Sequence, residues 1–309
     1  MLSAAAAPVV LSMVVGISIA LMLVRPAGIR EVYWVGGGAM LLVALRLVPL
    51  ALAGRAMAQG TDVYLFLIGM MLLSELAREH GVFDWLSSAA VRGAHGSAVR
   101  LFTLIYAIGM VVTVFLSNDA TAVVLTPAIL AAVRKARVEP LPHLFACALI
   151  ANAASFVLPI SNPANLVVFH QAMPPLGRWV AFFGVPSILS IAATYGTMRM
   201  VFRRPLQAKI EQTPEPAALR SEGRMVVVGI ALMVAALLTA SAFHKDLGLP
   251  TCIAALLLTL AVSLRTRTNP LQLAKQISWS TLALVAALFV LVNAVESIGA
   301  LRVTTASLE

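Results

Sequence analysis

Apolar runs recur along most of the chain, separated by short polar connections. A run of about twenty residues matches the ~30 Å hydrocarbon core of a bilayer, because an α-helix rises ~1.5 Å per residue. The pattern therefore predicts an all-α polytopic membrane protein. Continuous membrane-spanning helices are predicted at residues 8–24, 32–52, 63–77, 179–202, 225–243, 249–264 and 278–295.

Two further apolar segments are each interrupted near the middle by polar residues. In the first, Ser117, Asn118 and Asp119 separate an arm at residues 101–116 from an arm at residues 120–133. Neither arm is expected to cross the membrane comfortably. Basic residues flank both outer ends, and the positive-inside rule places such ends in the cytoplasm. A re-entrant hairpin with residues 117–119 at its tip is therefore predicted.

The second interrupted segment has two prolines at its centre, Pro159 and Pro163, which flank residues 160–162. Proline lacks a backbone donor and disrupts a helix. We therefore expect a crossing helix broken into two halves, residues 144–158 and 164–172. Irregular backbone at membrane depth is tolerated only where protein or a water-filled cavity surrounds it. Two such breaks close together predict a binding site near the bilayer midplane.

Composition and charge agree with a membrane protein. Of the 309 residues, 61% are hydrophobic and 11% are charged, with a mean hydropathy of +0.95, whereas soluble domains carry ~25% charged residues. The net charge of +9 comes from short connections, which indicates cytoplasmic loops and not a nucleic-acid partner. Residues 83–91 are predicted to form a short interfacial helix. Cys147 and Cys252 lie in apolar runs, so no disulfide, metal site or cofactor is predicted.

An internal repeat is visible in the sequence. The tetrapeptide VVGI at residues 14–17 recurs at 227–230, and residues 65–83 align loosely with 283–301. Five crossings separate the starts of the two copies, so the second copy is predicted to be inverted. Inverted repeats with broken helices are typical of secondary transporters. The charge bias places the N-terminus outside.

The repeat predicts three regions in the chain. Residues 1–202 form a first transmembrane repeat, which contains three spans, the hairpin, the broken helix and one more span. Residues 203–224 form a cytoplasmic loop. Residues 225–309 hold three spans that begin the second repeat, which ends before a hairpin of its own.

Asp119 is an ionisable side chain predicted to lie at membrane depth, where a charge is costly. Loss of water favours its neutral form. We therefore predict that Asp119 binds and releases a coupling proton. An alternative, compatible with coupling, is that the carboxylate caps the first amides of the trailing arm.

Amides and hydroxyls supply the other polar groups at the two interruptions, and they can both donate and accept hydrogen bonds. No Lys or Arg lies within residues 101–133 or 144–177, which suits an uncharged, hydroxylated substrate. An anion would depend on backbone amides and half-helix dipoles. The alternative role for these groups is to satisfy unwound backbone. The predicted substrate-binding residues are Ser117, Asn118, Thr121, Ser161, Asn162 and Asn165.

Asn152, Glu75 and Glu296 are secondary candidates. Asn152 lies on the approach to the second interruption. The two glutamates lie near the ends of their predicted helices, where an interfacial role competes with a role in a proton path. No nucleophile–base set or phosphate-binding loop is present, so an enzyme is not expected.

The sequence FLSNDAT at residues 115–121, followed by LTP at 125–127, resembles the hairpin of the ArsB-type arsenite efflux permeases, members of the ion transporter superfamily. LPISNPANL at residues 158–166 resembles the unwound helix of that family, and MMLLSE at residues 70–75 also matches. The resemblance implies export of arsenite and antimonite across the bacterial inner membrane. Members of the family work with protons or with an arsenite-stimulated ATPase subunit. The family pattern also has a second hairpin and a second broken helix, so the resemblance implies a member that lacks its C-terminal part.

Other functions remain open from the sequence. The same architecture serves sodium/proton antiporters and organic-anion transporters, and sodium-independent protection against arsenite would separate these from an arsenite exporter. The chain could also be an inactive fragment, or a subunit completed by another chain or by a second copy. Resistance conferred by the expressed 309 residues would distinguish an active chain from such a fragment.

Overall fold

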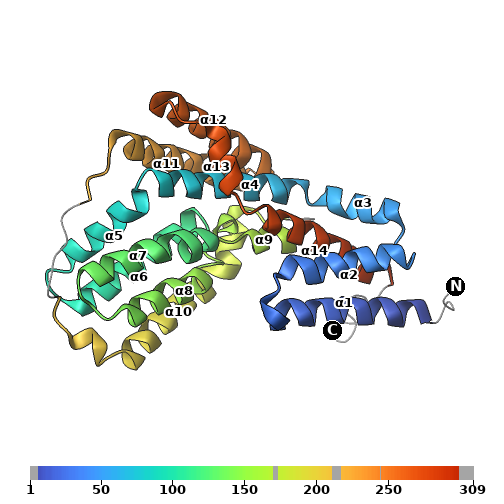
Figure 1. Cartoon of the computed structure of the whole chain (residues 1–309), viewed down its shortest axis with the longest axis horizontal. Coiled ribbons are helices and arrows are strands. Elements are labelled where there is room, and N and C mark those ends of the chain that lie inside the picture. Colours follow the sequence, from blue (N-terminus) through green and yellow to red (C-terminus); the bar gives the residue numbers. More distant parts are fainter. Residues whose placement is uncertain (1–5, 170–172, 211–216, 244, 299–309) are drawn as a thin grey trace. The chain divides into compact units, whose positions relative to one another are not determined.

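A computed structural model describes residues 6–169, 173–210, 217–243 and 245–298 (Figure 1). Within these residues every regular element is a helix, which confirms the predicted all-α class. Six of the described helices are long and apolar enough to cross a membrane, and α3 with α4 gives a seventh span if this bent pair counts as one. The chain is therefore a multi-pass membrane protein.

Most helices follow the predicted apolar runs. A helix, α5, is also present where an interfacial helix was predicted, and its interfacial location stays a prediction. The longer helices are α1 (Ala6–Val24), α4 (Thr61–Glu79), α5 (Val82–Gly93), α6 (Ala98–Phe115), α8 (Pro140–Ala153), α10 (Leu176–Val201), α11 (Ser221–Ala242), α12 (Gly248–Thr266) and α14 (Trp279–Ser297). A short helix that the sequence pattern missed, α13 (Pro270–Gln276), follows α12.

The predicted continuous span at residues 32–52 is wrong. Helix α2 (Glu31–Ala44) ends early, and a separate helix α3 (Leu50–Gln59) follows. Between them Arg46 adopts a left-handed φ of 57°, and Pro49 caps α3 in an extended conformation. A residue before proline disfavours helical geometry, so the apolar run is divided although its hydropathy is continuous. Helix α3 then meets α4 at a bend of 48°.

The described chain divides into two compact units. The first is drawn from residues 1–64 and 278–309 and contains α1, α2, α3 and α14. Helix α2 packs against both α1 and α14. Its core includes Val35, Leu42, Leu291 and Ala294, all at most 1% exposed.

The second unit, residues 65–277, contains both interrupted segments. Helix α8 contacts α6, α7 and α10 (Figure 1). An aromatic cluster joins three of these helices: Phe102 and Tyr106 of α6 stack with ring centroids 6.2 Å apart, and Tyr195 of α10 lies 5.7 Å from Phe102 and 5.3 Å from Tyr106. His143 of α8 meets the edge of Phe102 at 6.3 Å. These helices form the frame that holds the interruptions.

The chain reverses direction after α6, as the hairpin prediction requires. The Thr121 hydroxyl donates to the Gly109 carbonyl over 3.3 Å and lies 2.8 Å from the Thr113 hydroxyl, so the trailing arm returns along α6. The leading arm is longer than expected. Helix α6 has 18 residues, or ~27 Å at the usual helical rise. Contrary to the expectation that neither arm crosses comfortably, α6 is long enough to count among the candidate spans, so the hairpin prediction rests on the reversal and on the basic residues at its outer ends.

The trailing arm begins with a π-helix at Ala120–Leu125 and continues as α7 (Thr126–Lys135). The Thr126 hydroxyl donates to the Thr121 carbonyl over 2.9 Å, across five residues. Pro127 lies at this junction and has no N–H to bond the preceding turn. Single π-turns within helices are frequent at functional sites.

The second segment is broken more widely than predicted. Helix α8 ends at Ala153, a 3-10 turn covers Pro159–Ser161, and α9 (Pro163–Val168) has only six residues. The described part of the predicted arm at 164–172 stops at residue 169, and residues 170–172 lie outside the described residues.

Trp179 of α10 fixes this unwound segment in place. Its indole Nε1 donates to the Phe156 carbonyl over 2.9 Å, and the side chain is fully buried. The Phe183 and Phe169 rings lie 4.4 and 5.2 Å from the indole, centroid to centroid. The unwound backbone is therefore anchored to a long, regular helix.

Gly109 generates a prediction about the hairpin. A Cβ at this position would lie 2.7 Å from Ile150 Cγ2 and 3.7 Å from Thr121 Cγ2. We expect Gly109→Leu to separate α6 from α8 and from the returning arm and to destabilise the protein by ~1–3 kcal/mol, as overpacking does. Thermal unfolding in detergent measures this loss. Gly196→Leu in α10, where no atom lies within 4 Å of the added Cβ, is the matched control and should unfold near the parent temperature. Equal midpoints for the two variants would contradict the packing described for Gly109.

Candidate functional site

A buried serine joins the two interruptions. Ser161, in the 3-10 turn, donates its hydroxyl hydrogen to the Val114 carbonyl over 3.1 Å. The same oxygen accepts from the backbone N–H of Leu158 over 3.1 Å. Val114 lies at the end of α6, just before the hairpin tip. The unwound helix and the hairpin tip therefore adjoin, and that they share a binding site stays a prediction.

Two of the predicted residues cap helices. The Ser117 hydroxyl accepts from the Ala120 N–H over 3.1 Å. The Asn162 side-chain oxygen accepts from the Ala164 N–H over 2.9 Å at the start of α9. These are standard N-cap contacts. For Ser117 and Asn162 the structure therefore contains the backbone-satisfying role that was the alternative to substrate contact.

Asn165 satisfies several carbonyls of the unwound segment with one amide group. Its Nδ2 donates to the carbonyl of Ser155 over 2.9 Å, and more weakly to those of Pro159 over 3.3 Å and Leu158 over 3.4 Å. The side chain is 1% exposed. Its Oδ1 atom is buried and accepts no hydrogen bond within the described part of the chain. In Asn165 the Nδ2 group therefore stabilises the unwound segment, while the Oδ1 atom is an acceptor without a hydrogen bond.

Asn118 has a second unused acceptor, at the hairpin tip. Its Oδ1 is also buried and has no partner among the described residues. Three residues later Thr121 is fully buried and engaged with α6. Buried polar atoms are normally hydrogen-bonded, so an unpaired acceptor at each interruption indicates a place where a donor from outside the protein can bind.

Asp119 has an exposed side chain beside Asn118. It precedes the π-helix but makes no side-chain capping hydrogen bond, so the predicted capping role is not seen. It is also the single acidic residue in the sequence between positions 101 and 138. Its carboxyl group is thus accessible at the hairpin tip.

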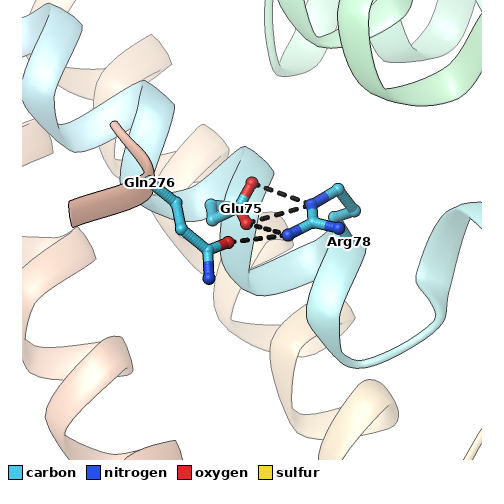
Figure 2. Close-up of polar contacts among 3 residues, drawn as sticks. All are labelled: Glu75, Arg78 and Gln276. Atoms are coloured by element: carbon cyan, nitrogen blue, oxygen red, sulfur yellow. Dashed lines mark hydrogen bonds and ion pairs between the residues drawn. The ribbon is translucent and has the colours of Figure 1, made fainter. Parts of the chain in front are cut away.

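The three secondary candidates lie elsewhere. Asn152 is exposed and donates to the Ala148 carbonyl of its own helix over 3.0 Å. Glu296 is exposed near the end of α14, in the other unit. Figure 2 shows that Glu75 pairs with Arg78 one turn along α4, and that Arg78 also donates to the Gln276 side chain of α13 over 2.7 Å. The structure brings none of the three to the interruptions through a hydrogen bond.

Sequence reasoning missed Thr113 and Trp179. Thr113 is fully buried and pairs with Thr121, and the only signal for it was a hydroxyl within an apolar run. Trp179 was included only as the start of a span. Within the described residues no group of three or more His, Cys, Asp or Glu side chains could hold a metal ion, and both cysteines are buried and free.

Asn165 generates a stability prediction. Replacement by Ala leaves the Ser155 carbonyl without its side-chain donor in a buried segment, which typically costs ~1–3 kcal/mol. We expect Asn165→Ala to lower the thermal midpoint of the purified protein. Asn152→Ala, which removes an exposed amide bonded within its own helix, is the control and should change it little. A midpoint for Asn165→Ala that matches Asn152→Ala would show that these bonds do not stabilise the segment.

For Glu75, in contrast to Asn165, we expect a substitution to have little effect on stability. The Arg78 side chain is 52% exposed and the Glu75 side chain 13%, so water screens the cation of this pair, and such pairs contribute only ~0–1 kcal/mol. We therefore expect Glu75→Gln, which keeps an oxygen that can accept from Arg78, to unfold close to the parent temperature. The expectation fails if Glu75→Gln is as destabilising as Asn165→Ala, since the charge of Glu75 would then contribute more than a partly exposed ion pair does.

Several known membrane proteins are similar in sequence to this chain. The chain is 31% identical over 144 residues to an arsenical pump membrane protein of Yersinia enterocolitica, which covers 46% of this chain and 34% of that protein. It is 28% identical over 155 residues to an arsenical pump membrane protein of Escherichia coli, covering 48% and 36%. An uncharacterised transporter of Mycobacterium bovis is 25% identical over 248 residues, covering 77% and 56%. The matches therefore span about half of these relatives or less.

A model of one protein family matches nearly the whole chain. The family is described as a citrate transporter family, and the match covers residues 9–309. That range includes both interruptions and every predicted span except residue 8 of the first. With its helical membrane fold, this chain therefore belongs to the citrate transporter family.

Proposed function

We propose that this chain is a secondary transporter that exports arsenite and antimonite across the bacterial plasma membrane in exchange for protons. The substrate binds where the hairpin tip meets the unwound helix. Asn118, Thr121, Ser161 and Asn165 face or frame the substrate, and Asp119 carries the coupling proton. Ser117 and Asn162 hold the helix ends that shape the site.

The observation that carries this proposal is the pair of unused acceptors. Asn118 Oδ1 and Asn165 Oδ1 are buried and unpartnered among the described residues. Arsenous acid is uncharged at neutral pH and presents three hydroxyl donors. Each hydroxyl can donate to such an acceptor, which removes the cost of leaving a buried oxygen unpaired.

A tricarboxylate is the second candidate, because the family is described as citrate transporters. Such an anion presents acceptors and requires donors or cations. No Lys or Arg lies in residues 101–133 or 144–177. Two unpaired oxygens would repel a carboxylate, so this part of the site favours a neutral hydroxylated substrate. The names of the arsenical pump relatives support the same choice.

The coupling role of Asp119 follows from its position. An ionisable group at a hairpin tip is costly in its charged form at membrane depth. A proton that neutralises Asp119 on one side of the membrane can be released on the other, which links transport to the proton gradient. The chain could also associate with an arsenite-stimulated ATPase subunit or with a second copy of itself, and either partner would bind outside this site.

Arsenite accumulation in everted membrane vesicles tests the proposal. Vesicles that contain the full chain should accumulate arsenite when a pH gradient is imposed, with choline in place of sodium and without inhibition by citrate. Citrate uptake without arsenite uptake would favour the second candidate. Absence of both would contradict transport by this chain alone.

Two variants separate substrate binding from coupling. We expect Asp119→Asn to lose gradient-driven accumulation but to keep arsenite counterflow, in which labelled arsenite exchanges for unlabelled arsenite without net proton movement. Asn118→Ala should weaken both by ~10-fold, since a lost hydrogen bond of ~1–1.5 kcal/mol changes affinity by about that factor.

Glu75→Gln is the matched carboxylate control, because Glu75 is ion-paired with Arg78 and lies on α4. It should retain both activities. Gradient-driven accumulation that survives Asp119→Asn would remove Asp119 from the coupling step, and loss in Glu75→Gln would transfer that role to Glu75.

A further inference from the structure

The second unit contains an apolar cavity beside the hairpin tip. Its volume is about 360 Å³, within the ~300–1,000 Å³ range of ligand pockets. It is formed by the end of α4, the first turns of α5, the last turns of α6 and the middle of α11, and all of its lining residues are apolar or aromatic. The residues that line the cavity include Trp85, Phe115, Leu116, Val227, Ala231 and Val234.

The cavity reaches the surface, because two of its lining residues, Val111 of α6 and Ala231 of α11, are exposed. Ala231 lines it and is exposed, and its neighbours Val228 and Leu232 are 57% and 68% exposed. In a chain that spans a membrane, such a surface meets lipid hydrocarbon. An apolar lining gives water no hydrogen-bond partners, so water does not fill the space. Leaving it empty would forfeit dispersion contacts on every wall.

A cation lies above the cavity on the same face of α11. Arg224 precedes Val227, Ala231 and Val234 by three, seven and ten residues, spacings that keep all four on one side of a helix. The step from Arg224 to Val234 is ~15 Å along the axis. Arg224 donates through Nε to the Leu219 carbonyl, which leaves its terminal amino groups for a further acceptor. The neighbouring Glu222 accepts from the Ser221 hydroxyl.

We propose that this cavity binds a phospholipid of the bilayer, with its phosphate at Arg224 and one acyl chain between α5, α6 and α11. The cation at the surface end of α11 and the apolar cavity beneath it match the two ends of a phospholipid. The acyl chain contacts Phe115 and Leu116, the residues immediately before the hairpin tip, so a bound lipid supports the tip. This site is separate from the polar groups of the transport proposal and does not depend on the substrate.

Trp85 lines the cavity and provides a direct probe. The full chain, with Trp34→Phe and Trp279→Phe, is reconstituted in nanodiscs with phosphatidylglycerol brominated on its acyl chains, because bromine quenches tryptophan emission on contact. The other remaining tryptophan, Trp179, is fully buried against α9 and the unwound segment and serves as the unquenched reference. We expect emission from Trp85 to be quenched.

One variant in the cavity, one at the assigned headgroup position and one matched control make the result specific. Ala231→Phe fills the cavity and should abolish the quenching of Trp85. Ala236→Phe adds the same side chain at an exposed position of α11 outside the cavity and should leave it intact. Arg224→Gln should reduce quenching at low lipid content, where headgroup binding limits occupancy.

Intact emission from Trp85 in the parent would overturn the proposal. So would equal quenching in Ala231→Phe and Ala236→Phe, because the lipid contact would then lie outside the cavity. If Ala231→Phe fails to fold, as judged by the emission of Trp179 and by size exclusion, unchanged quenching in Arg224→Gln overturns the assigned headgroup position, and reduced quenching supports it.

Discussion

The unwound segment between α8 and α9 can exist inside a membrane only because its backbone groups are hydrogen-bonded by side chains. Lipid offers no replacement for water, so each exposed carbonyl would cost several kcal/mol. The Asn165 amide serves three of these carbonyls, two of them through long hydrogen bonds, and the Trp179 indole serves a fourth. One buried amide therefore makes the break compatible with the rest of the fold.

The same requirement explains why the two interruptions adjoin. Ser161 accepts from the Leu158 N–H within the turn and donates to the Val114 carbonyl at the end of α6. A single hydroxyl thus satisfies the unwound helix and the hairpin together. Among the described residues of the interruptions, the buried side-chain atoms left without a hydrogen bond are two amide oxygens, Asn118 Oδ1 and Asn165 Oδ1. A site for a hydrogen-bond donor is consequently a by-product of how the backbone is satisfied, and its chemistry is that of an acceptor.

Hydropathy predicted most of this fold, because the membrane imposes one length on every crossing helix. It failed where local backbone geometry overrides hydropathy: at Arg46 and Pro49, which divide the second span, and at Ala120–Leu125, just before Pro127, where the returning arm is a π-helix. The site residues were identified as polar exceptions in apolar runs. Their individual roles could not be predicted. Asn162, which caps a helix, and Asn118, whose side-chain oxygen is unpaired, are the same residue type and differ only in their hydrogen bonds.

Under the proposed function, this difference in hydrogen bonding would decide which residues can change during transport. Groups that cap helices or satisfy carbonyls, such as Ser117 and most of Asn165, are committed in the described conformation, and releasing them exposes backbone to lipid. Asn118 Oδ1 and the Asp119 carboxyl have no such commitment. Under the proposed function, a substrate or proton that bound these two groups would stabilise the hairpin tip without breaking a hydrogen bond seen among the described residues. The adjacent residues at the tip would then respond to substrate and proton while the frame around them stayed intact.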